Sequence, residues 1–263
     1  MKYTEGYLAF LDILGFSNFV RDESNGQETE KLFEFIKKFC YLFNTSPQLD
    51  VNVSFFSDTI IITSKELSKL QVPICISEIY LKSTLGLLFR GGIVYGKYYH
   101  KDGSTFGPAV IEGYKLEKQA VYSRILIADN IPIKENDLMF FVDVDGQKCL
   151  NPYGILVFEP VINLSKESSS KIDINKLVIE NFSTLRNELL LQINKYKGSS
   201  VVDKYLWRVR AYNSVCRLIL KLPEGEVISS EHDYKINSSL KEHILQMIIS
   251  ENDIFHFNNS EMN

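Results

Sequence analysis

The sequence predicts an α+β protein with a ferredoxin-like βαββαβ core, extra strands after that core and a helical C-terminal extension. Three observations support this class. Short apolar runs of strand length alternate with stretches of helical periodicity in the first part of the chain. Two of these runs are separated by only two residues, which is hairpin spacing. The last third of the chain carries long amphipathic stretches instead, which indicate helices.

The first elements follow the order that this core requires. Residues 7–11 form an apolar run that predicts a buried strand. After a polar break at residues 22–27, apolar side chains at helical spacing predict a helix that ends at residues 46–47, Ser-Pro. Residues 51–56 and 59–63 predict the two strands of a hairpin. The apolar positions of the helix are Leu32, Phe35, Ile36, Phe39 and Phe43.

Two more helices flank the next strand. Pro73 opens a predicted helix that runs to about Phe89. Residues 90–96 then form a glycine-flanked strand. Pro108 suits the first turn of a third helix, which we place at residues 109–120.

Three short strands complete the predicted sheet, at residues 125–128, 138–144 and 155–158, with a turn at residues 145–146, Asp-Gly. The resulting order, βαββαβαβββ, contains the split βαβ unit of ferredoxin-like folds.

A serine-rich break at residues 165–170 marks a predicted domain boundary. We place the core domain at residues 1–162 and the helical extension at residues 163–263. The extension must pack its wide apolar stripe on the core or on a second subunit. Its helices are predicted at residues 174–196, 201–220 and 239–250.

Composition excludes several classes of function. The net charge is −4 and the basic residues are scattered, so we expect no binding to nucleic acid. No apolar run approaches the roughly 20 residues of a transmembrane helix, and the N-terminus lacks a secretory signal. The four cysteines are far apart and show no zinc-ligand spacing. Together these features predict a cytoplasmic protein with reduced thiols and no transmembrane segment.

Two isolated aspartates mark the ends of predicted strands. Asp12 follows the first apolar strand, and Asp58 lies between the two hairpin strands. A carboxylate at the end of a buried strand is costly unless a cation or hydrogen-bond donors meet it. Either aspartate alone has a simpler interpretation as a cap or turn residue. As a pair, they are candidate ligands of a divalent cation.

The order of these landmarks resembles the catalytic domain of class III nucleotidyl cyclases. In that family, a strand ending in a metal-binding Asp, a hairpin with a second Asp, a glycine-flanked strand and a helix with a Leu-Glu pair follow one another. Here the landmarks are Asp12, Asp58, residues 90–96 and residues 106–117. The resemblance covers about residues 7–160.

The chain is most similar to one branch of the family, the stand-alone bacterial pyrimidine cyclases of the Pycsar antiphage system. The motif DILGF at residues 12–16, the motif FGPA at residues 106–109 and the pattern E-x-Y-x-L-E at residues 112–117 carry this similarity. It implies conversion of UTP or CTP to the 3′,5′-cyclic monophosphate and pyrophosphate, as a second messenger in antiphage defence.

The resemblance also implies a metal and phosphate site. Two Mn²⁺ or Mg²⁺ ions would be held by Asp12, Asp58 and the carbonyl of Ile13, which are the oxygen ligands that such ions prefer. The turn after Asp12 would offer backbone N–H groups to the triphosphate. The residues of that turn are Gly15, Phe16 and Ser17.

Four positions depart from the purine cyclases. Ser54 and Ser104 stand where those enzymes read the base with charged residues, and we expect both to lie in the base pocket. Ile111 and Lys115 stand where they carry a transition-state Asn and Arg. The usual recognition of adenine or guanine is therefore absent, which favours a pyrimidine. Lys115 could still act catalytically on the phosphates as a point charge, or be a solvated helix lysine.

Four further residues are candidates for substrate contacts, and three of them have structural alternatives. Arg90 is either a phosphate or base contact or an ion-paired structural residue. Phe16 and Phe56 either line the pocket or belong to the core. Glu112 lies beside the transition-state position and is a candidate polar contact. We interpret His100 as a loop residue.

The leading hypothesis is a homodimeric, metal-dependent pyrimidine cyclase with composite sites between protomers. The residues barely separate UTP from CTP, and UTP is favoured because uridylate cyclases are the broader group among the proteins that this chain resembles. Two alternatives stay open: a purine cyclase with an atypical base pocket, and a cyclase-like module that binds nucleotide without turnover.

Overall fold

The structure is a computed structural model of the chain. It describes residues 2–22, 26–134, 137–157, 173–224, 227–229 and 234–256. The chain divides into two compact units: residues 1–133 with 142–152, and residues 134–141 with 153–263. The domain boundary predicted between residues 162 and 163 lies outside the described residues. Among the helices of the described part, none is long and apolar enough to cross a membrane.

The first unit is built on an antiparallel sheet with ferredoxin-like strand order. Its four central strands lie in the order β2-β3-β1-β4, and every neighbouring pair is antiparallel. This is the order that a βαββαβ chain produces, so the predicted fold class is confirmed. The strands are β1 (Thr4–Leu14), β2 (Val51–Phe56), β3 (Thr59–Ser64) and β4 (Leu88–Lys101).

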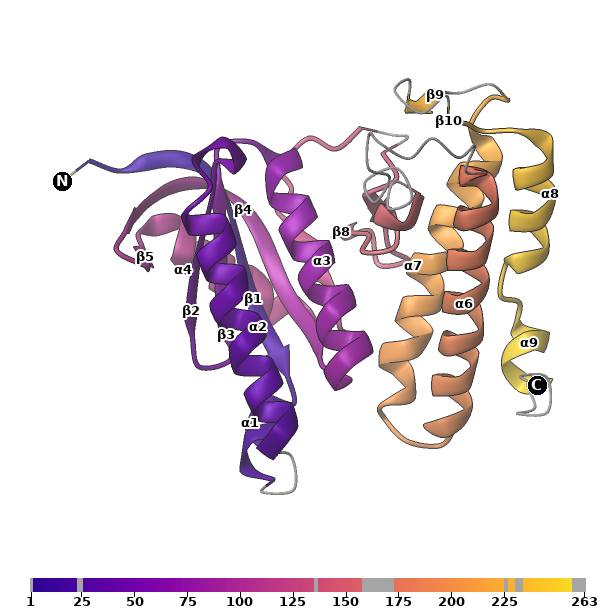
Figure 1. Cartoon of the computed structure of the whole chain (residues 1–263), viewed down its shortest axis with the longest axis horizontal. Coiled ribbons are helices and arrows are strands. Elements are labelled where there is room, and N and C mark those ends of the chain that lie inside the picture. The colour runs from indigo at the N-terminus through magenta and orange to yellow at the C-terminus, as the bar shows by residue number, and fades with distance from the viewer. Residues whose placement is uncertain are drawn as a thin grey trace. The chain divides into compact units, whose positions relative to one another are not determined.

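Helices cover both faces of this sheet. α2 (Gly26–Asn44) and α3 (Leu67–Leu85) lie on one face, and α4 (Pro108–Gln119) lies on the other (Figure 1). The ring of Phe10 contacts the ring of Tyr114 in α4 at a centroid distance of 5.7 Å. Because side chains alternate along a strand, Asp12 lies on the same face as Phe10. The first candidate aspartate therefore lies on the α4 side of the sheet.

Short strands extend the sheet beyond the core. β6 (Ile125–Ile127) runs parallel to β4, and β8 (Lys148–Leu150) pairs with β6. β5 (Ser104–Phe106) pairs with the far end of β4. β7 (Phe140–Val142) precedes β8 across the predicted Asp145-Gly146 turn. Two short helical segments, α1 (Phe16–Arg21) and the 3₁₀ turn η2 (Pro47–Leu49), complete the first unit.

The second predicted helix begins and ends earlier than expected. α3 starts at Leu67, so that Pro73 lies inside the helix and not at its beginning. A proline there removes a backbone hydrogen bond, but Leu70 and Ile74 on either side of it are fully buried, which offsets the loss. The helix ends at Gly86, which adopts a left-handed conformation (φ 65°) suited to a helix C-terminus.

The strand predicted at residues 155–158 is wrong for its described part, residues 155–157. The backbone N–H of Leu156 bonds to the carbonyl of Tyr153, and that of Val157 bonds to the carbonyl of Gly154. These are turn-like bonds between near neighbours, not ladder bonds. Residues 148–150 provide the pairing strand instead, because Cys149 and Leu150 are buried against β6.

The second unit is helical, as predicted. The side chains of Phe182, Trp207 and Tyr212 form its buried core, where the Tyr212 hydroxyl donates to the carbonyl of Phe182 (3.2 Å). The last predicted helix, at residues 239–250, ends at Met247, and a further helix begins at Glu251, beyond the predicted end. The elements are α6 (Ile174–Lys195), α7 (Val202–Lys221), the hairpin of β9 (Val227–Ser229) and β10 (Tyr234–Lys235), α8 (Ser238–Met247) and α9 (Glu251–His256).

Candidate active site

The two candidate aspartates lie at the same end of the sheet. Asp12 is opposite Thr59 in the register of β1 and β3, and Asp58 immediately precedes Thr59 in the hairpin turn. One step beyond this pair, the N–H of Ile13 donates to the carbonyl of Asp58 across 2.8 Å. The hairpin turn is therefore fastened to the end of β1. Both aspartates are partly exposed to solvent, so neither is buried in the core.

The turn that carries Asp58 is tight. Phe56 and Thr59 are the last paired residues of the hairpin, which leaves a loop of Ser57 and Asp58 alone. Ser57 has φ 57°, in the left-handed region that residues other than glycine rarely adopt. A strained residue beside a candidate ligand is common at functional sites, although strain alone assigns no function.

The turn after Asp12 leads directly into a short helix. Gly15 adopts a left-handed conformation (φ 82°, ψ 4°) and precedes α1. Phe16 is half-buried and Ser17 is exposed, and both belong to the first turn of α1. Backbone N–H groups of a first helical turn have no acceptor within the helix, so they are available to other groups.

Arg90 contacts Asp12. Its Nη2 donates to Asp12 Oδ2 (3.1 Å), and its Nε lies 2.6 Å from Glu117 Oε1. Arg90 is 26% exposed and Asp12 is 22% exposed, whereas Glu117 is 1% exposed. Arg90 is therefore ion-paired and lies directly beside the candidate ligand; its predicted contact with phosphate or base stays a prediction.

Ser54 belongs to a second polar group on the sheet. Its Oγ lies 2.7 Å from Thr105 Oγ1 and 3.5 Å from His100 Nδ1, and His100 Nδ1 lies 2.8 Å from Thr105 Oγ1. His100 is in β4, so its interpretation as a loop residue is wrong. Partial burial lowers the pKa of His100, against a smaller opposing effect of Asp102. Burial therefore favours the neutral form of this imidazole.

The other predicted contacts lie on the surface. Ser104 is exposed at the start of β5, next to Thr105, and the Phe56 side chain is 83% exposed at the end of β2. Glu112 and Lys115 pair with each other at 2.9 Å on the exposed side of α4, with about the same exposure (60% and 61%). Within one chain, the structure gives Lys115 no contact with either aspartate; its predicted catalytic role stays a prediction.

The donor set suits a hard divalent cation. Two carboxylates are available, and the Ile13 carbonyl lies on the same edge of β1 as its N–H, toward Asp58. Mg²⁺ and Mn²⁺ commonly combine one or two carboxylates with water and substrate phosphates. Among the described residues no group of three His, Cys, Asp or Glu side chains could hold a metal. A cation here would therefore be held by Asp12, Asp58 and a carbonyl, and a bound substrate would add phosphate oxygens.

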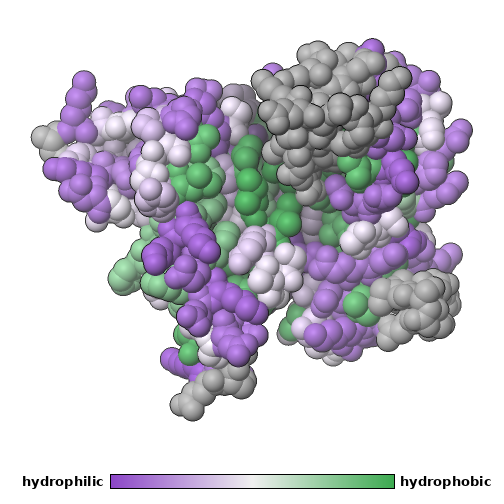
Figure 2. Space-filling model, in the orientation of Figure 1, coloured by the Kyte–Doolittle hydropathy of each residue, from purple (hydrophilic) through white to green (hydrophobic). Residues whose placement is uncertain are grey.

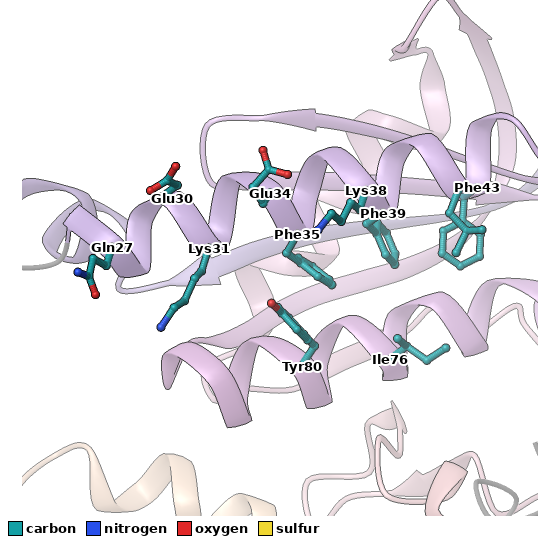
Figure 3. A pocket seen from close by; sticks show the side chains of 11 residues that line it. Gln27, Glu30, Lys31, Glu34, Phe35, Lys38, Phe39, Phe43, Ile76 and Tyr80 are labelled. Atoms are coloured by element: carbon teal, nitrogen blue, oxygen red, sulfur yellow. The ribbon is translucent and has the colours of Figure 1, made fainter. Parts of the chain in front are cut away.

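A groove on the opposite face of the sheet is separate from this site. It has a volume of about 810 Å³ and lies between α2 and α3, where the rings of Phe35 and Tyr80 stack at 4.3 Å (Figure 3). Figure 2 shows hydrophobic side chains over this part of the first unit, among hydrophilic ones. Its lining is Gln27, Glu30, Lys31, Glu34, Phe35, Lys38, Phe39, Leu42, Phe43, Ile76 and Tyr80.

Sequence patterns do not identify three residues near the site: Glu117, His100 and Thr105. Glu117 belongs to the Leu-Glu pair of the motif, but no sequence pattern shows that a helix carboxylate is buried under a strand arginine. His100 and Thr105 could have been found. Residues 102–103, Asp-Gly, are a strong hairpin signal, and a hairpin there pairs His100 with Thr105.

Comparison with known proteins places few constraints on the chain. No protein-family model matches it, and no curated protein matches it. Among solved structures, it is similar to an adenylate/guanylate cyclase/hydrolase from Silicibacter pomeroyi, with 16% sequence identity and a TM-score of 0.34, over 56% of this chain and 95% of that chain. The ferredoxin-like order of the sheet is established separately, by its strand pairings.

Proposed function

We propose that this protein is a metal-dependent nucleotidyl cyclase that acts on a pyrimidine nucleoside triphosphate. One observation carries the proposal: the hydrogen bond from Ile13 to Asp58, which brings two isolated aspartates to the same end of the sheet. The order of motifs resembles that of class III cyclases, which implies that the two aspartates bind metal ions. UTP is the favoured substrate and CTP the alternative.

The reaction is an in-line attack of the ribose 3′-hydroxyl on the α-phosphorus, which releases pyrophosphate. Asp12, Asp58 and the Ile13 carbonyl would hold two Mn²⁺ or Mg²⁺ ions. When bound, such ions acidify the hydroxyl and neutralise phosphate charge. The N–H groups of the turn after Asp12 would receive the triphosphate, and Arg90 would orient the Asp12 carboxylate.

The polar group around Ser54 is the proposed base-reading group. Ser54, Thr105 and His100 present two hydroxyl groups and one imidazole, which can both donate and accept hydrogen bonds. The choice of a pyrimidine rests on the sequence, where Ser54 and Ser104 replace the charged residues with which purine cyclases read the base. The resemblance to Pycsar cyclases adds the proposed role of the product, as a messenger in antiphage defence.

A homodimer with composite sites is part of the proposal. α4 packs on β4 and β1. β3 and β2 follow β1 toward the edge of the sheet, on the side away from β4. Large apolar side chains are exposed there: Phe56 (83%), and Ile111 (57%) and Tyr114 (48%) on α4. A second copy would cover them and could bring its own Lys115 toward the aspartates of the first.

The direct experiment is to incubate the purified protein with each of the four NTPs and Mn²⁺ and to resolve the products by mass. We expect cyclic UMP or cyclic CMP, and no cyclic product from Asp12→Asn. Cyclic AMP or cyclic GMP as the main product would instead support a purine cyclase with an atypical pocket. Nucleotide binding without any cyclic product would support an inactive module.

A further inference from the structure

Arg90 is the middle member of a chain of ion pairs that connects Asp12 to the interior of the first unit. Its Nη2 contacts Asp12 Oδ2 at 3.1 Å, and its Nε contacts Glu117 Oε1 at 2.6 Å. Asp12 and Arg90 are opposite one another in the register of β1 and β4. Opposite residues of antiparallel strands share a face, so the sheet itself aligns the first pair and α4 supplies the second.

Glu117 depends on Arg90 for its charge balance. Its side chain is 1% exposed, and a buried carboxylate costs several kcal/mol unless a cation compensates it. Lys118 lies farther away, at 3.6 Å from Oε2, and its own side chain is 54% exposed. The Nε–Oε1 contact is close, although the two atoms are not aligned as a hydrogen bond. Arg90 is thus the main countercharge of Glu117.

The helix that carries Glu117 is held close to the sheet. A Cβ atom on Gly92 would lie 2.8 Å from Leu116 Cβ, and one on Gly113 would lie 3.0 Å from Phe10 Cβ. These glycines allow α4 and the strands to approach at backbone distance. Glu117 therefore has little freedom to shift, which is the property required of a residue that supports a functional side chain.

Glu117 also sets the charge around Asp12. Asp12, Arg90 and Glu117 together carry a net charge of −1, and Asp58 makes it −2. Without Glu117 the net charge of this group changes from −2 to −1. The full positive charge of the Arg90 guanidinium would then compete with the cation for Asp12. In the described structure Arg90 bonds to Oδ2 of Asp12, and no hydrogen bond to Oδ1 is formed.

We infer that Glu117 is a positioning residue for the divalent-cation site: acting through Arg90, it fixes the Asp12 carboxylate and keeps the guanidinium from competing with the cation. The inference rests on the proposed function, because it requires Asp12 to be a metal ligand. Partners that orient a ligating carboxylate typically change metal affinity 10- to 100-fold when they are lost.

The test is Mn²⁺ binding to the full chain without nucleotide, measured by the electron paramagnetic resonance signal of free Mn²⁺. We expect Glu117→Gln to weaken Mn²⁺ binding about 10- to 100-fold. Glu117→Asp keeps the charge with a shorter reach and should restore binding in part. Asp129→Asn removes the same charge from an exposed position outside the candidate site and should change binding less than about twofold. Thermal melts identify any variant that has not folded.

The outcomes separate the inference from the proposed function. If wild type binds Mn²⁺ and Asp12→Asn does not, but Glu117→Gln binds as well as wild type, the positioning role is wrong. Equal weakening by Asp129→Asn would also overturn it, because it would reduce the effect to general charge. If wild type fails to bind Mn²⁺, or Asp12→Asn binds equally well, the proposed metal site itself fails. If Glu117→Gln does not fold, Mn²⁺ binding is measured with Arg90→Lys in its place. Wild-type Mn²⁺ affinity in Arg90→Lys would contradict the inference.

Discussion

The N–H of Ile13 lies 2.8 Å from the carbonyl oxygen of Asp58, across the gap between the end of β1 and the hairpin turn. This one bond joins two segments that are 45 residues apart in the sequence. It also uses only backbone atoms, so it occupies neither carboxylate, of which that of Asp12 pairs with Arg90. The carbonyl side of Ile13 faces the same turn.

Replacing Asp58 with alanine should abolish cyclase turnover and leave the proposed dimer intact. The loss should be about 1,000-fold or more, since a catalytic metal contributes several kcal/mol to the transition state. The backbone bond to Ile13 does not need the carboxylate, so folding should be little affected. Product formation and light scattering measure the two effects. Asp129→Ala, at an exposed position, is the matched control; retained activity in Asp58→Ala would show that the metal assignment is wrong.

Ser57→Gly should stabilise the first unit. Ser57 has φ 57°, and a left-handed conformation costs a residue with a Cβ atom about 1–2 kcal/mol. Glycine removes that cost but loses more entropy on folding, so we expect a net gain of about 0.5–1 kcal/mol in urea unfolding. Ser83→Gly, on the exposed side of α3, should destabilise by a similar amount. A destabilised Ser57→Gly protein would mean that the serine side chain supports the turn.

The sequence was sufficient for the elements that local patterns determine. Apolar runs located β1, β2 and β3, and two-residue spacing located the turn of Asp58. Local rules failed where burial opposed them, as at Pro73, which lies inside α3 because its neighbours Leu70 and Ile74 are buried.

Contacts between distant segments were beyond such rules. The pair of Arg90 and Glu117 connects a strand to a helix 27 residues later, and no periodicity predicts which helix carboxylate is buried beneath the arginine. The aspartate pair could be proposed as a unit because both residues lie at the ends of apolar strands, and the family resemblance added an expected proximity. The hydrogen bond between Ile13 and Asp58 shows how the chain segments of the two aspartates are joined.

Ile111→Asp should weaken the proposed dimer. Ile111 is 57% exposed on α4, in the region that a second copy would cover. Burying an unpaired carboxylate costs about 3 kcal/mol or more, so the dissociation constant should rise about 100-fold or more. Size-exclusion chromatography with light scattering measures the change. Val144→Asp adds the same charge at an 85% exposed position and should have no such effect. An unchanged dimer in Ile111→Asp would place the interface elsewhere.

Acid should destabilise the protein in part through His100. Burial lowers the pKa of His100 in the folded state below its ordinary value of 6.5. As the pH falls below 6.5, the unfolded chain therefore binds a proton that the folded chain does not bind. The free energy of unfolding must decrease between pH 6.5 and the lowered pKa, and this effect is absent above that range.

Asn in place of His100 keeps polar groups near Thr105 but cannot titrate. We expect the loss of stability between pH 7.5 and 5.5, measured by urea unfolding, to be smaller in His100→Asn than in wild type. His243→Asn, on the exposed side of α8, should behave as wild type. Equal pH dependence in all three proteins would show that the Ser54, His100 and Thr105 group does not hold a neutral imidazole.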